Sequence, residues 1–488
     1  MNLNDYEIVI GLEIHAQLLT RSKLFCSCST AYGQPPNTQT CPVCLGLPGA
    51  LPVVNQEAVF MAIKFGLAVG ATINRFSEFS RKHYFYPDLP KGYQITQYDR
   101  PIAQGGSIIF ITPEGRKSIG LERINLEEDA GKSIHDGLPD SALRSSLDFN
   151  RCGVPLLEIV GRPEIHSPEE AVEFLQALRT LLLYLEICDG NMEEGSLRCD
   201  ANISVRPKGS HRLGVKTEIK NLNSFRFLQK ALEYEARRQA ELLASGKTIH
   251  QETRLFNPDE NKTFPMRSKE EAHDYRYFPE PDLPPLILEP EMIEAARQSL
   301  PELPHEKLER FMSQYQLPLY DAKILTSSRA LADYFEKTAS ACRAPKSASN
   351  WIMREVLRYL KEKELSIENF SISPELLAEL ITLVESKKIT MAVAKDVIFP
   401  EMLARPRSPQ AIMEEKGLLR LSDEETIKAA IDQVLAKNPG PVNQYLQGKC
   451  QVLGFLMGQV MKETRGLADP QLVQSWLKTK LDELASQK

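Results

Sequence analysis

The chain has 488 residues, of which 42% are hydrophobic and 25% are charged, and its formal net charge is −6. This composition is ordinary for soluble globular proteins and excludes a disordered, collagen-like or low-complexity chain. No stretch reaches the roughly 18 uninterrupted apolar residues of a membrane helix, and residues 1–7 lack the basic and apolar regions of a secretory signal peptide. We therefore expect a cytoplasmic protein with no membrane partner.

The first 290 residues are predicted to form an α+β domain. Short apolar runs bounded by turn residues indicate strands at 6–14, 106–112 and 201–206. A Ser-Pro-Glu-Glu sequence predicts the start of a helix over 168–185, and a second helix is predicted at 222–243. Because these strands and helices follow no regular βαβ rhythm, they favour a mixed α+β arrangement.

The composition changes near residue 290. A proline-rich segment, 279–285, favours an extended connection, and the sequence that follows has an almost continuous helical period. A second proline-containing break at 405–409 precedes a last block of amphipathic helices. The sequence thus predicts a mixed α/β domain at 1–290 and two all-helical domains at 291–404 and 405–488.

Four of the nine cysteines, Cys26, Cys28, Cys41 and Cys44, form two closely spaced pairs joined by a loop. Two such pairs can supply the four thiolates of a tetrahedral zinc site, and a site with four cysteine ligands is closed and therefore structural. Four unrelated thiols and a redox Cys-x-x-Cys pair are the alternatives, although redox chemistry leaves the first pair unexplained. The spacing favours a zinc knuckle at 26–44.

Acidic residues and one histidine form a second group. Glu13 and His15 lie two apart on a predicted strand, so their side chains point to the same face. Glu158 lies within an apolar run, where a carboxylate is costly to bury without a partner or a metal. With an acid from 127–129, this group could hold Mg²⁺. An arginine partner for Glu158 and a solvated turn at 127–129 remain open alternatives.

A third group is basic and aromatic and lies at 81–94. Lysines interleaved with tyrosines could bind a phosphate and stack on a base, although an exposed loop with buried aromatic rings gives the same pattern. The candidate binding residues here are Lys82, Tyr84, Tyr86, Lys91 and Tyr93.

Read in order, these segments resemble the B subunit of the tRNA-dependent amidotransferase. The motifs that carry the resemblance lie at 9–15, 81–94, 126–133, 148–160, 193–202, 220–225 and 274–282. They are long and specific, whereas the two helical blocks match the family's arrangement and no sharp motif.

The resemblance implies an enzyme made of three different polypeptides. The B subunit would bind aminoacyl-tRNA and ATP and phosphorylate the side-chain carboxylate of the attached amino acid. The A subunit would release ammonia from glutamine, and a small C subunit would wrap both. The substrates would be Glu-tRNA(Gln), Asp-tRNA(Asn) or both, and ammonia would pass through a channel to the acyl phosphate.

The resemblance also assigns residues within a catalytic cradle at 1–290. It implies a catalytic group of Glu13, His15, Glu128 and Glu158, in which His15, Glu128 and Glu158 hold Mg²⁺. Beyond the basic and aromatic group, it implies ATP or substrate binding by Arg198, Asp200, Asn202, Lys220, Asn223 and Ser224. It gives the tail domain the role of binding tRNA, for which the candidates are Lys449, Lys462 and Arg465.

Two other functions remain as alternatives. A noncatalytic scaffold that positions tRNA for the amidase would need no acidic group with a histidine. A synthetase-like ligase is disfavoured because the chain has no His-x-Gly-His segment.

Overall fold

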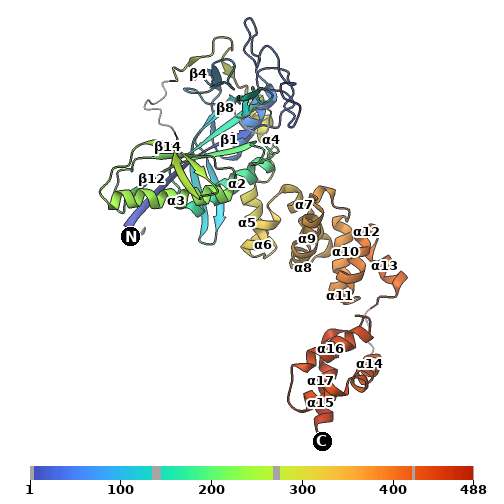
Figure 1. Ribbon diagram of the computed structural model, residues 1–488. Coiled ribbons are helices and arrows are strands. Elements are labelled where there is room, and N and C mark those ends of the chain that lie inside the picture. The colour runs from blue at the N-terminus through green and yellow to red at the C-terminus, as the bar shows by residue number, and fades with distance from the viewer. Residues whose placement is uncertain (1–4, 135–143, 267–274, 420–423, 487–488) are drawn as a thin grey trace. The chain divides into compact units, whose positions relative to one another are not determined.

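The computed structural model describes residues 5–134, 144–266, 275–419 and 424–486. Packing divides the chain into two compact units, Met1–Glu309 and Arg310–Lys488 (Figure 1). The first unit contains the strands and the second is helical, so the predicted combination of a mixed α/β region and a helical C-terminal region is confirmed.

The first unit is organised around one large sheet. Among the described residues its strand order is β15-β14-β13-β12-β1-β11-β8-β6-β2, and β7 pairs with β8. The strands are β1 (Tyr6–Gln17), β2 (Thr72–Ile73), β6 (Ala103–Gln104), β7 (Ser107–Thr112), β8 (Gly115–Glu128), β11 (Pro155–Gly161), β12 (Leu197–Pro207), β13 (Thr217–Lys220), β14 (Glu252–Asn257) and β15 (Lys262–Pro265).

Strand β1 lies at the centre of this sheet and pairs antiparallel with both β11 and β12. Its register places His15 opposite Glu158 on one neighbour and opposite Arg198 on the other. Residues directly opposite in a sheet point to the same face. The pairing therefore gathers polar side chains from three separate parts of the sequence.

Smaller sheets flank the large one. Strands β4 (Ser80–His83) and β5 (Tyr93–Thr96) pair in one of them, with β16 (Phe278–Pro279) at the edge of β4. The two others pair β9 (Lys132–Ile134) with β10 (Ser146–Asp148), and β3 (Phe76–Ser77) with β17 (Leu286–Ile287).

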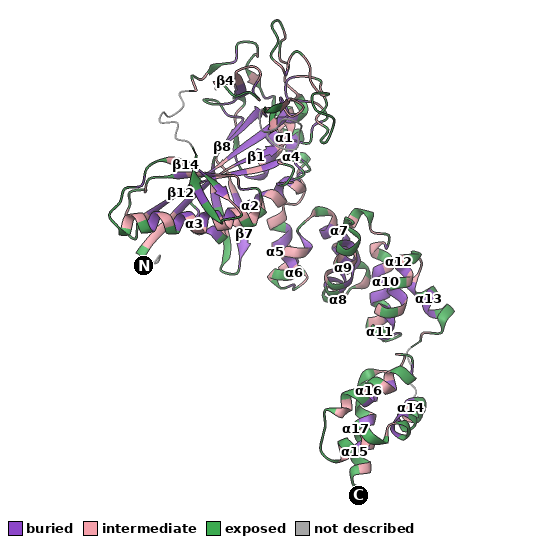
Figure 2. Ribbon diagram, in the orientation of Figure 1, coloured by how far each residue is buried: buried purple, intermediate pink, exposed green. Residues whose placement is uncertain are grey.

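Four helices pack within the first unit: α1 (Gln56–Ala68), α2 (Pro168–Tyr184), α3 (Phe225–Ala244) and α4 (Pro290–Gln298). Helix α3 packs on β12, α2 on β7 and α1 on β8, and the buried residues of these elements form one continuous core (Figure 2). The predicted strands and both predicted helices of this unit are present, within a few residues of the expected ends.

The first unit extends beyond the proline-rich segment that composition suggests as its end. Helix α4 packs against α1, and its Ala296 is completely buried in the core of the first unit. The division between units falls at Glu309 because packing, and not composition, decides which elements share a core. The domain boundary expected near residue 290 remains a prediction, because a division by packing contacts does not by itself define where a domain ends.

The second unit consists of short helices. These are α5 (Pro304–Gln314), which crosses the boundary, α6 (Leu319–Leu325), α7 (Arg329–Cys342), α8 (Pro345–Trp351), α9 (Leu357–Lys363), α10 (Pro374–Glu385), α11 (Met391–Val393), α12 (Phe399–Ala404), α13 (Pro409–Lys416), α14 (Glu424–Lys437), α15 (Pro439–Leu446), α16 (Val452–Glu463) and α17 (Pro470–Ser486). Two single π-helical turns, Ile352–Val356 and Ala394–Ile398, and a 3₁₀ turn, Ile367–Asn369, lie between them.

The last four helices have a core of their own. It is built from buried aliphatic residues such as Ile427, Leu456 and Leu477. The predicted boundary between two helical domains at 404/405 remains a prediction, because packing keeps both helical blocks in one unit.

The capping residue predicted for α2 allows a test of the fold. Oγ of Ser167 accepts a hydrogen bond of 3.1 Å from the backbone N–H of Glu170. Replacing such a cap with alanine costs about 1 kcal/mol, so we expect Ser167→Ala to lower the stability of the first unit by that amount in urea unfolding.

Ser245→Ala is the matched control, because Ser245 lies at the C-terminal end of α3 and its hydroxyl donates to the carbonyl of Leu242. It should change stability by less than about 0.5 kcal/mol. Equal losses in the two variants would contradict the capping role.

Candidate functional site

A cluster of carboxylates surrounds one histidine at the centre of the large sheet. Nε2 of His15 lies 3.4 Å from a carboxylate oxygen of Glu127, 3.8 Å from one of Glu13 and 4.0 Å from one of Glu158. One ligand atom from each of Glu13, His15 and Glu158 falls within a single group whose atoms lie within 4.8 Å of one another. Glu13 and His15 share a face as the strand pattern predicts, and Glu158 joins them as the resemblance implies.

Glu128 does not belong to this cluster, which corrects the ligand set that the resemblance implies. Adjacent residues of a strand point to opposite faces, and Glu127 and Glu128 are the last two residues of β8. The carboxylate of Glu127 faces His15. That of Glu128 faces away, where it pairs with the ammonium of Lys91 and accepts a 2.9 Å hydrogen bond from the backbone N–H of Ile95.

The sequence placed Glu127 with Glu128 and Asp129 among the candidate acids, and the strand register selects Glu127 from the three. Glu158 lies opposite Asn125 in the β11–β8 register, so residues 125 and 127 share the face of Glu158. The side chain of Asn125 donates a hydrogen bond to Glu158, and its own buried Oδ1 has no hydrogen-bond partner among the described residues. This oxygen is an uncharged potential metal ligand on the same face as the carboxylates.

Burial and mutual repulsion set the protonation of this cluster. Burial, with the charge of Glu158, raises the pKa of Glu13 to about 7 and that of Glu127 to about 8. Burial alone would also raise the pKa of Glu158, but the interaction with His15, the hydrogen bond from Asn125 and the charge of Lys82 lower it overall. Burial lowers the pKa of His15, so its imidazole is neutral at pH 7 and able to bind a metal.

The chemistry of this cluster fits a hard divalent cation. Mg²⁺ prefers a few carboxylate oxygens and keeps positions for water or a substrate phosphate. The cluster offers such ligands. They are three carboxylates that resist joint ionisation, a neutral imidazole and an amide oxygen that has no hydrogen-bond partner among the described residues.

Lys82 is the basic residue that faces this cluster. Its ammonium lies 4.9 Å from the ring centroid of Tyr275 and 6.0 Å from that of Tyr84. Burial alone would lower its pKa, but the carboxylates of Glu127 and Glu158 raise it overall, so Lys82 stays charged. The half-buried lysine is placed to meet an anionic group that approaches the cluster.

Apart from Tyr84, whose ring lies near Lys82, the residues of the basic and aromatic group have other surroundings. Lys91 is on the Glu128 side, and its ammonium lies 5.3 Å from the ring centroid of Tyr93. The hydroxyl of Tyr84 donates to the side chain of Gln94 over 3.2 Å, whereas Tyr86 is half exposed. In the β4–β5 register Lys82 lies opposite Gln94 and His83 opposite Tyr93, so Lys82 and Tyr93 point to opposite faces.

Among the predicted binding residues of β12, Arg198 and Asp200 have local partners. Arg198 forms two hydrogen bonds of 3.1 Å with the carboxylate of the buried Asp129. Asp200 lies opposite Glu13 in the register and accepts a 2.8 Å bond from the ammonium of Lys220. Both therefore line the same side of the sheet as His15.

The remaining predictions near β12 and α3 have different outcomes. Asn202 lies opposite Gly11 on β1, beyond the pairs that carry the polar cluster. Ser224 caps α3 by accepting a 3.1 Å hydrogen bond from the backbone N–H of Phe227, and Asn223 is exposed and donates to Asn221. The structure gives Ser224 a local structural role that the sequence motif did not reveal.

The four cysteines at 26–44 converge as their spacing predicts. Their Sγ atoms all lie within 4.8 Å of one another, and those of Cys41 and Cys44 are 3.9 Å apart. A tetrahedral Zn–S₄ site with bonds of about 2.3 Å needs sulfur atoms roughly 3.8 Å apart. The arrangement is therefore compatible with zinc.

The electrostatics of the knuckle favour one thiolate before a metal binds. A hydrogen bond from Cys26 lowers the pKa of Cys44 to about 4, and the charge of Lys23 lowers it further. Burial and a hydrogen bond with Cys41 raise the pKa of Cys28 to about 11.

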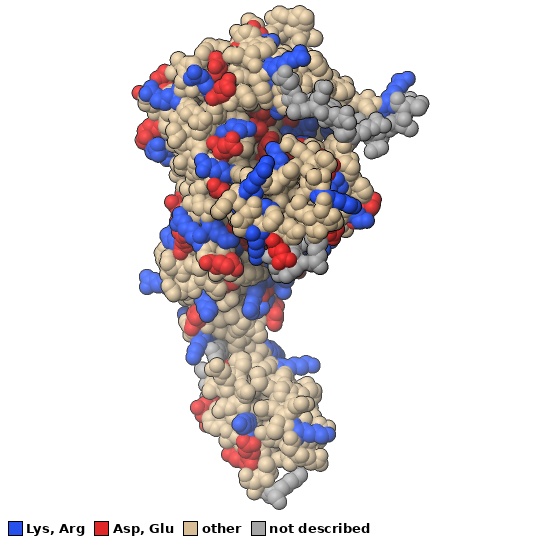
Figure 3. Space-filling model, turned by 90° about the vertical axis from the view of Figure 1, so that its left-hand side faces the viewer, with Lys and Arg blue, Asp and Glu red and all other residues tan. Residues whose placement is uncertain are grey.

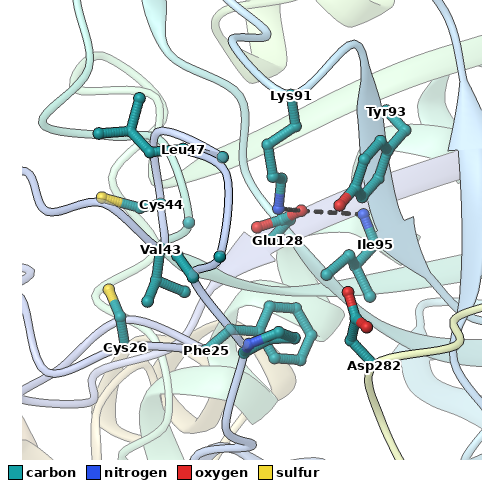
Figure 4. Close-up of a pocket in the computed structure, with 15 residues that line it drawn as sticks. Phe25, Cys26, Val43, Cys44, Leu47, Lys91, Tyr93, Ile95, Glu128 and Asp282 are labelled. Atoms are coloured by element: carbon teal, nitrogen blue, oxygen red, sulfur yellow. Dashed lines mark hydrogen bonds and ion pairs between the residues drawn. The ribbon is translucent and has the colours of Figure 1, made fainter.

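A cavity of about 200 Å³ lies between the knuckle and the Lys91–Glu128 pair. Figure 4 shows Cys26 and Cys44 on one side of it and Lys91, Glu128 and Asp282 on the other. Phe25 and Val43 provide apolar surface between the two. The cavity is thus separated from the His15 cluster by the thickness of β8.

The three basic candidates of the tail lie at the surface. Lys449 follows α15, Lys462 lies in the last turn of α16 and Arg465 follows it, and all three are exposed. On the face shown in Figure 3 basic and acidic side chains are interspersed. In the parts of the chain that the structure describes, no helix is long and apolar enough to cross a membrane.

Comparison with known proteins identifies the family. The GatB/GatE catalytic domain model matches residues 8–294, and the GatB domain model matches residues 333–481. These two matches cover the strand-containing unit and most of the helical one.

Curated relatives match over nearly the whole chain. The B subunit of the aspartyl/glutamyl-tRNA(Asn/Gln) amidotransferase of Myxococcus xanthus is 53% identical over 99% of this chain and 100% of its own length. The proteins of the same name from Caldanaerobacter subterraneus and Chlorobium phaeobacteroides are also 53% identical, over 98% of this chain and 100% of their own length. With a carboxylate–histidine cluster in the matched catalytic domain, the chain belongs to the B-subunit family of the tRNA-dependent amidotransferases.

Proposed function

We propose that this chain is the activating component of a cytoplasmic tRNA-dependent amidotransferase. It binds aminoacyl-tRNA and ATP and phosphorylates the side-chain carboxylate of the attached glutamate or aspartate. An A subunit supplies ammonia from glutamine to the acyl phosphate, and the heterotrimer is completed by a C subunit. The substrates are Glu-tRNA(Gln), Asp-tRNA(Asn) or both, which an assay with each misacylated tRNA distinguishes.

The observation that carries this proposal is the cluster of Glu13, Glu127 and Glu158 around the neutral His15. Phosphoryl transfer needs charge neutralisation at the moving phosphate more than it needs covalent help from the protein. A bound Mg²⁺ would supply that neutralisation. The chain's own part is to hold the cation through His15 and the carboxylates of Glu13, Glu127 and Glu158.

Lys82 would act on the substrate side of the same face. Its ammonium stays charged beside the carboxylates and has aromatic rings on two sides. A lysine in this position can bind a phosphate oxygen as a point charge. Asp200 and Lys220 extend the polar face along β12 and β13, where they could contact the tRNA end or the nucleotide.

A noncatalytic scaffold is the competing function. A scaffold would bind tRNA without needing three carboxylates on one face, of which Glu127 and Glu158 are buried and therefore expensive to maintain. Hydrolysis of ATP that depends on the misacylated tRNA, measured in the assembled complex without glutamine, separates the two functions. The scaffold predicts no such hydrolysis.

The first prediction concerns the corrected ligand set. In the assembled complex, Glu127→Gln and Glu158→Gln should each lower transamidation by at least ~10²-fold, because the metal contributes several kcal/mol of charge stabilisation. Raised Mg²⁺ should restore part of the activity. Hydrolysis of glutamine by the A subunit should continue.

Glu128→Gln is the matched control, because it makes the same change one residue further along β8 on the opposite face. Whatever its effect on the rate, its Mg²⁺ dependence should equal that of the unaltered complex. A shifted Mg²⁺ dependence in Glu128→Gln, with none in Glu127→Gln, would restore Glu128 to the ligand set.

The second prediction concerns the cysteine knuckle, which we propose holds a structural zinc ion. Metal analysis of freshly purified, reduced protein should give about one zinc per chain, as a closed four-thiolate site requires. Cys41→Ser should remove the metal and lower the thermal stability of the first unit. Its effect on the Mg²⁺ dependence of the surviving activity should be small.

Cys342→Ser provides the comparison, because Cys342 lies at the end of α7, outside the knuckle. It should leave the zinc content unchanged. The proposed site would be contradicted if the protein, refolded with excess zinc under reducing conditions and purified again, contained no zinc.

The third prediction concerns the tail. Residues 407–488 contain 11 Lys or Arg and 10 Asp or Glu, so their net charge is only +1. Binding of folded tRNA would then depend on local groups that contact the backbone. Removing 424–488 should weaken tRNA binding, while α13 keeps its packing on α10 and glutamine hydrolysis without tRNA persists.

Single replacements refine this test. Lys449→Ala, Lys462→Ala or Arg465→Ala should each reduce the dependence of tRNA affinity on salt concentration, because each phosphate contact releases counterions. Lys478→Ala, on the exposed side of α17, should not. Unchanged tRNA affinity in the truncated complex would contradict the role of the tail.

A further inference from the structure

Lys23 is a completely buried lysine beside the cysteine knuckle. It lies three residues before Cys26 and is one of the largest side chains in the molecule with no exposed surface. Lysine is almost never fully buried unless it is paired. The partners of this ammonium group therefore need to be identified.

The ammonium of Lys23 has three acceptors from three separate segments. It donates to the backbone carbonyl of Gln39 over 2.7 Å and to that of Phe149 over 3.3 Å. Its third contact is Sγ of Cys44, at 3.6 Å. A lysine has three N–H donors, so these contacts use all of them.

Only one of these partners can carry a charge. The two carbonyl groups satisfy hydrogen bonds but leave the positive charge uncompensated, and an isolated buried charge is costly. No carboxylate forms an ion pair with Lys23 among the described residues. The counter-charge available to Lys23 is the thiolate of Cys44 and, through it, the rest of the knuckle.

A zinc-bound knuckle would carry a negative charge that the ammonium of Lys23 can partly neutralise. Four thiolates around one Zn²⁺ carry a net charge of −2, and the buried ammonium reduces the total to −1. An N–H···S hydrogen bond to a charged sulfur also stabilises the thiolate form that binds metal. Groups that orient or polarise the ligands in this way typically affect metal affinity by 10–100-fold.

Packing holds Lys23 in this position. Gly153 has a φ of +86°, and a Cβ atom built there would lie 3.3 Å from Cδ of Lys23 and 3.4 Å from Cβ of Cys44. The backbone of Gly153 accepts from Leu24 and donates to Asp129, each over 2.8 Å. The lysine stem is thus enclosed by the segment that leads into β11.

We propose that Lys23 is the internal counter-cation of the four-cysteine metal site and that it joins this site to the segment preceding the strand of Glu158. The inference rests on the zinc proposed above. It assigns to this chain a metal-positioning residue outside the four cysteines. The substitution Lys23→Met removes the charge and the donors with little change in apolar volume.

The test measures the metal and not the activity. Zinc-loaded protein is challenged with a chelator that reports free zinc, and the zinc dissociation constant is obtained by competition. Lys23→Met should bind zinc 10–100-fold more weakly than the unaltered chain. Lys64→Met is the matched control, because Lys64 also donates to a backbone carbonyl, that of Leu185 over 2.8 Å, but lies on α1. Lys64→Met should leave the zinc affinity unchanged.

A spectroscopic readout separates an electronic effect from a loss of shape. Co²⁺ bound to thiolates gives sulfur-to-metal charge-transfer bands. Loss of an N–H···S bond makes the sulfur easier to oxidise, so these bands should move to longer wavelength in Lys23→Met. Lys23→Arg, which keeps the charge and the donors, should keep zinc affinity within about 10-fold and show the smaller band shift.

Each outcome decides between defined alternatives. If the unaltered chain binds no zinc, the zinc proposal itself fails. If it binds zinc and Lys23→Met retains both the affinity and the cobalt bands, Lys23 is not the counter-cation. If Lys23→Met and Lys23→Arg both fail to fold with zinc present while Lys64→Met folds, Lys23 is a core element of the fold and the inference is overturned.

Discussion

The pairing of β1 with β11 and β12 is the constraint on which the site depends. His15 lies opposite Glu158 on one side and Arg198 on the other, and Glu13 lies opposite Asp200. A slip of one residue in either pairing would send every side chain of that strand to the opposite face. The apolar residues of these strands specify the register, because the alternate positions of β1 and β12 fill the core (Figure 2). The hydrophobic core and the polar cluster are therefore consequences of the same register.

Strand β8 uses the same alternation to divide two environments. Glu127 faces the His15 cluster, and Glu128 faces the cavity beside the cysteine knuckle, where it pairs with Lys91 (Figure 4). Asp129, the next residue, points to the same side as Glu127 and accepts hydrogen bonds from Arg198. Three consecutive acids thus have three different partners. A buried acid at each position is tolerated because each has a specific cation, donor or neighbouring ligand on its own face.

What the sequence predicted correctly is what short-range geometry determines. The parity of Glu13 and His15 follows from one strand, the convergence of the cysteines follows from their spacing, and the cap of α2 follows from four adjacent residues. The choice between Glu127 and Glu128 failed because it requires the register of β8 against β11, which no local pattern supplies. The burial of Lys23 was not predicted, because a lysine beside a cysteine motif is usually solvated and only tertiary packing shows that this one is buried. The packing of α4 on α1 was beyond local pattern for the same reason, since it is a tertiary contact.

Charge balance connects these separate observations. In each of three places a lysine is buried or half-buried beside anionic groups: Lys91 with Glu128, Lys82 with the His15 cluster and Lys23 with the knuckle. The first is balanced, one cation against one carboxylate. The second sets one ammonium against three carboxylates, and the third sets one against four thiols that bind metal as thiolates. Because buried excess charge is costly, the two unbalanced sites are where a divalent cation is most strongly favoured, and one prefers oxygen ligands while the other prefers sulfur. The same physical argument therefore supports both proposals. The proposed Mg²⁺ site lies on one face of β8, and the proposed zinc site lies on the far side of the cavity. The balanced Lys91–Glu128 pair lies between them.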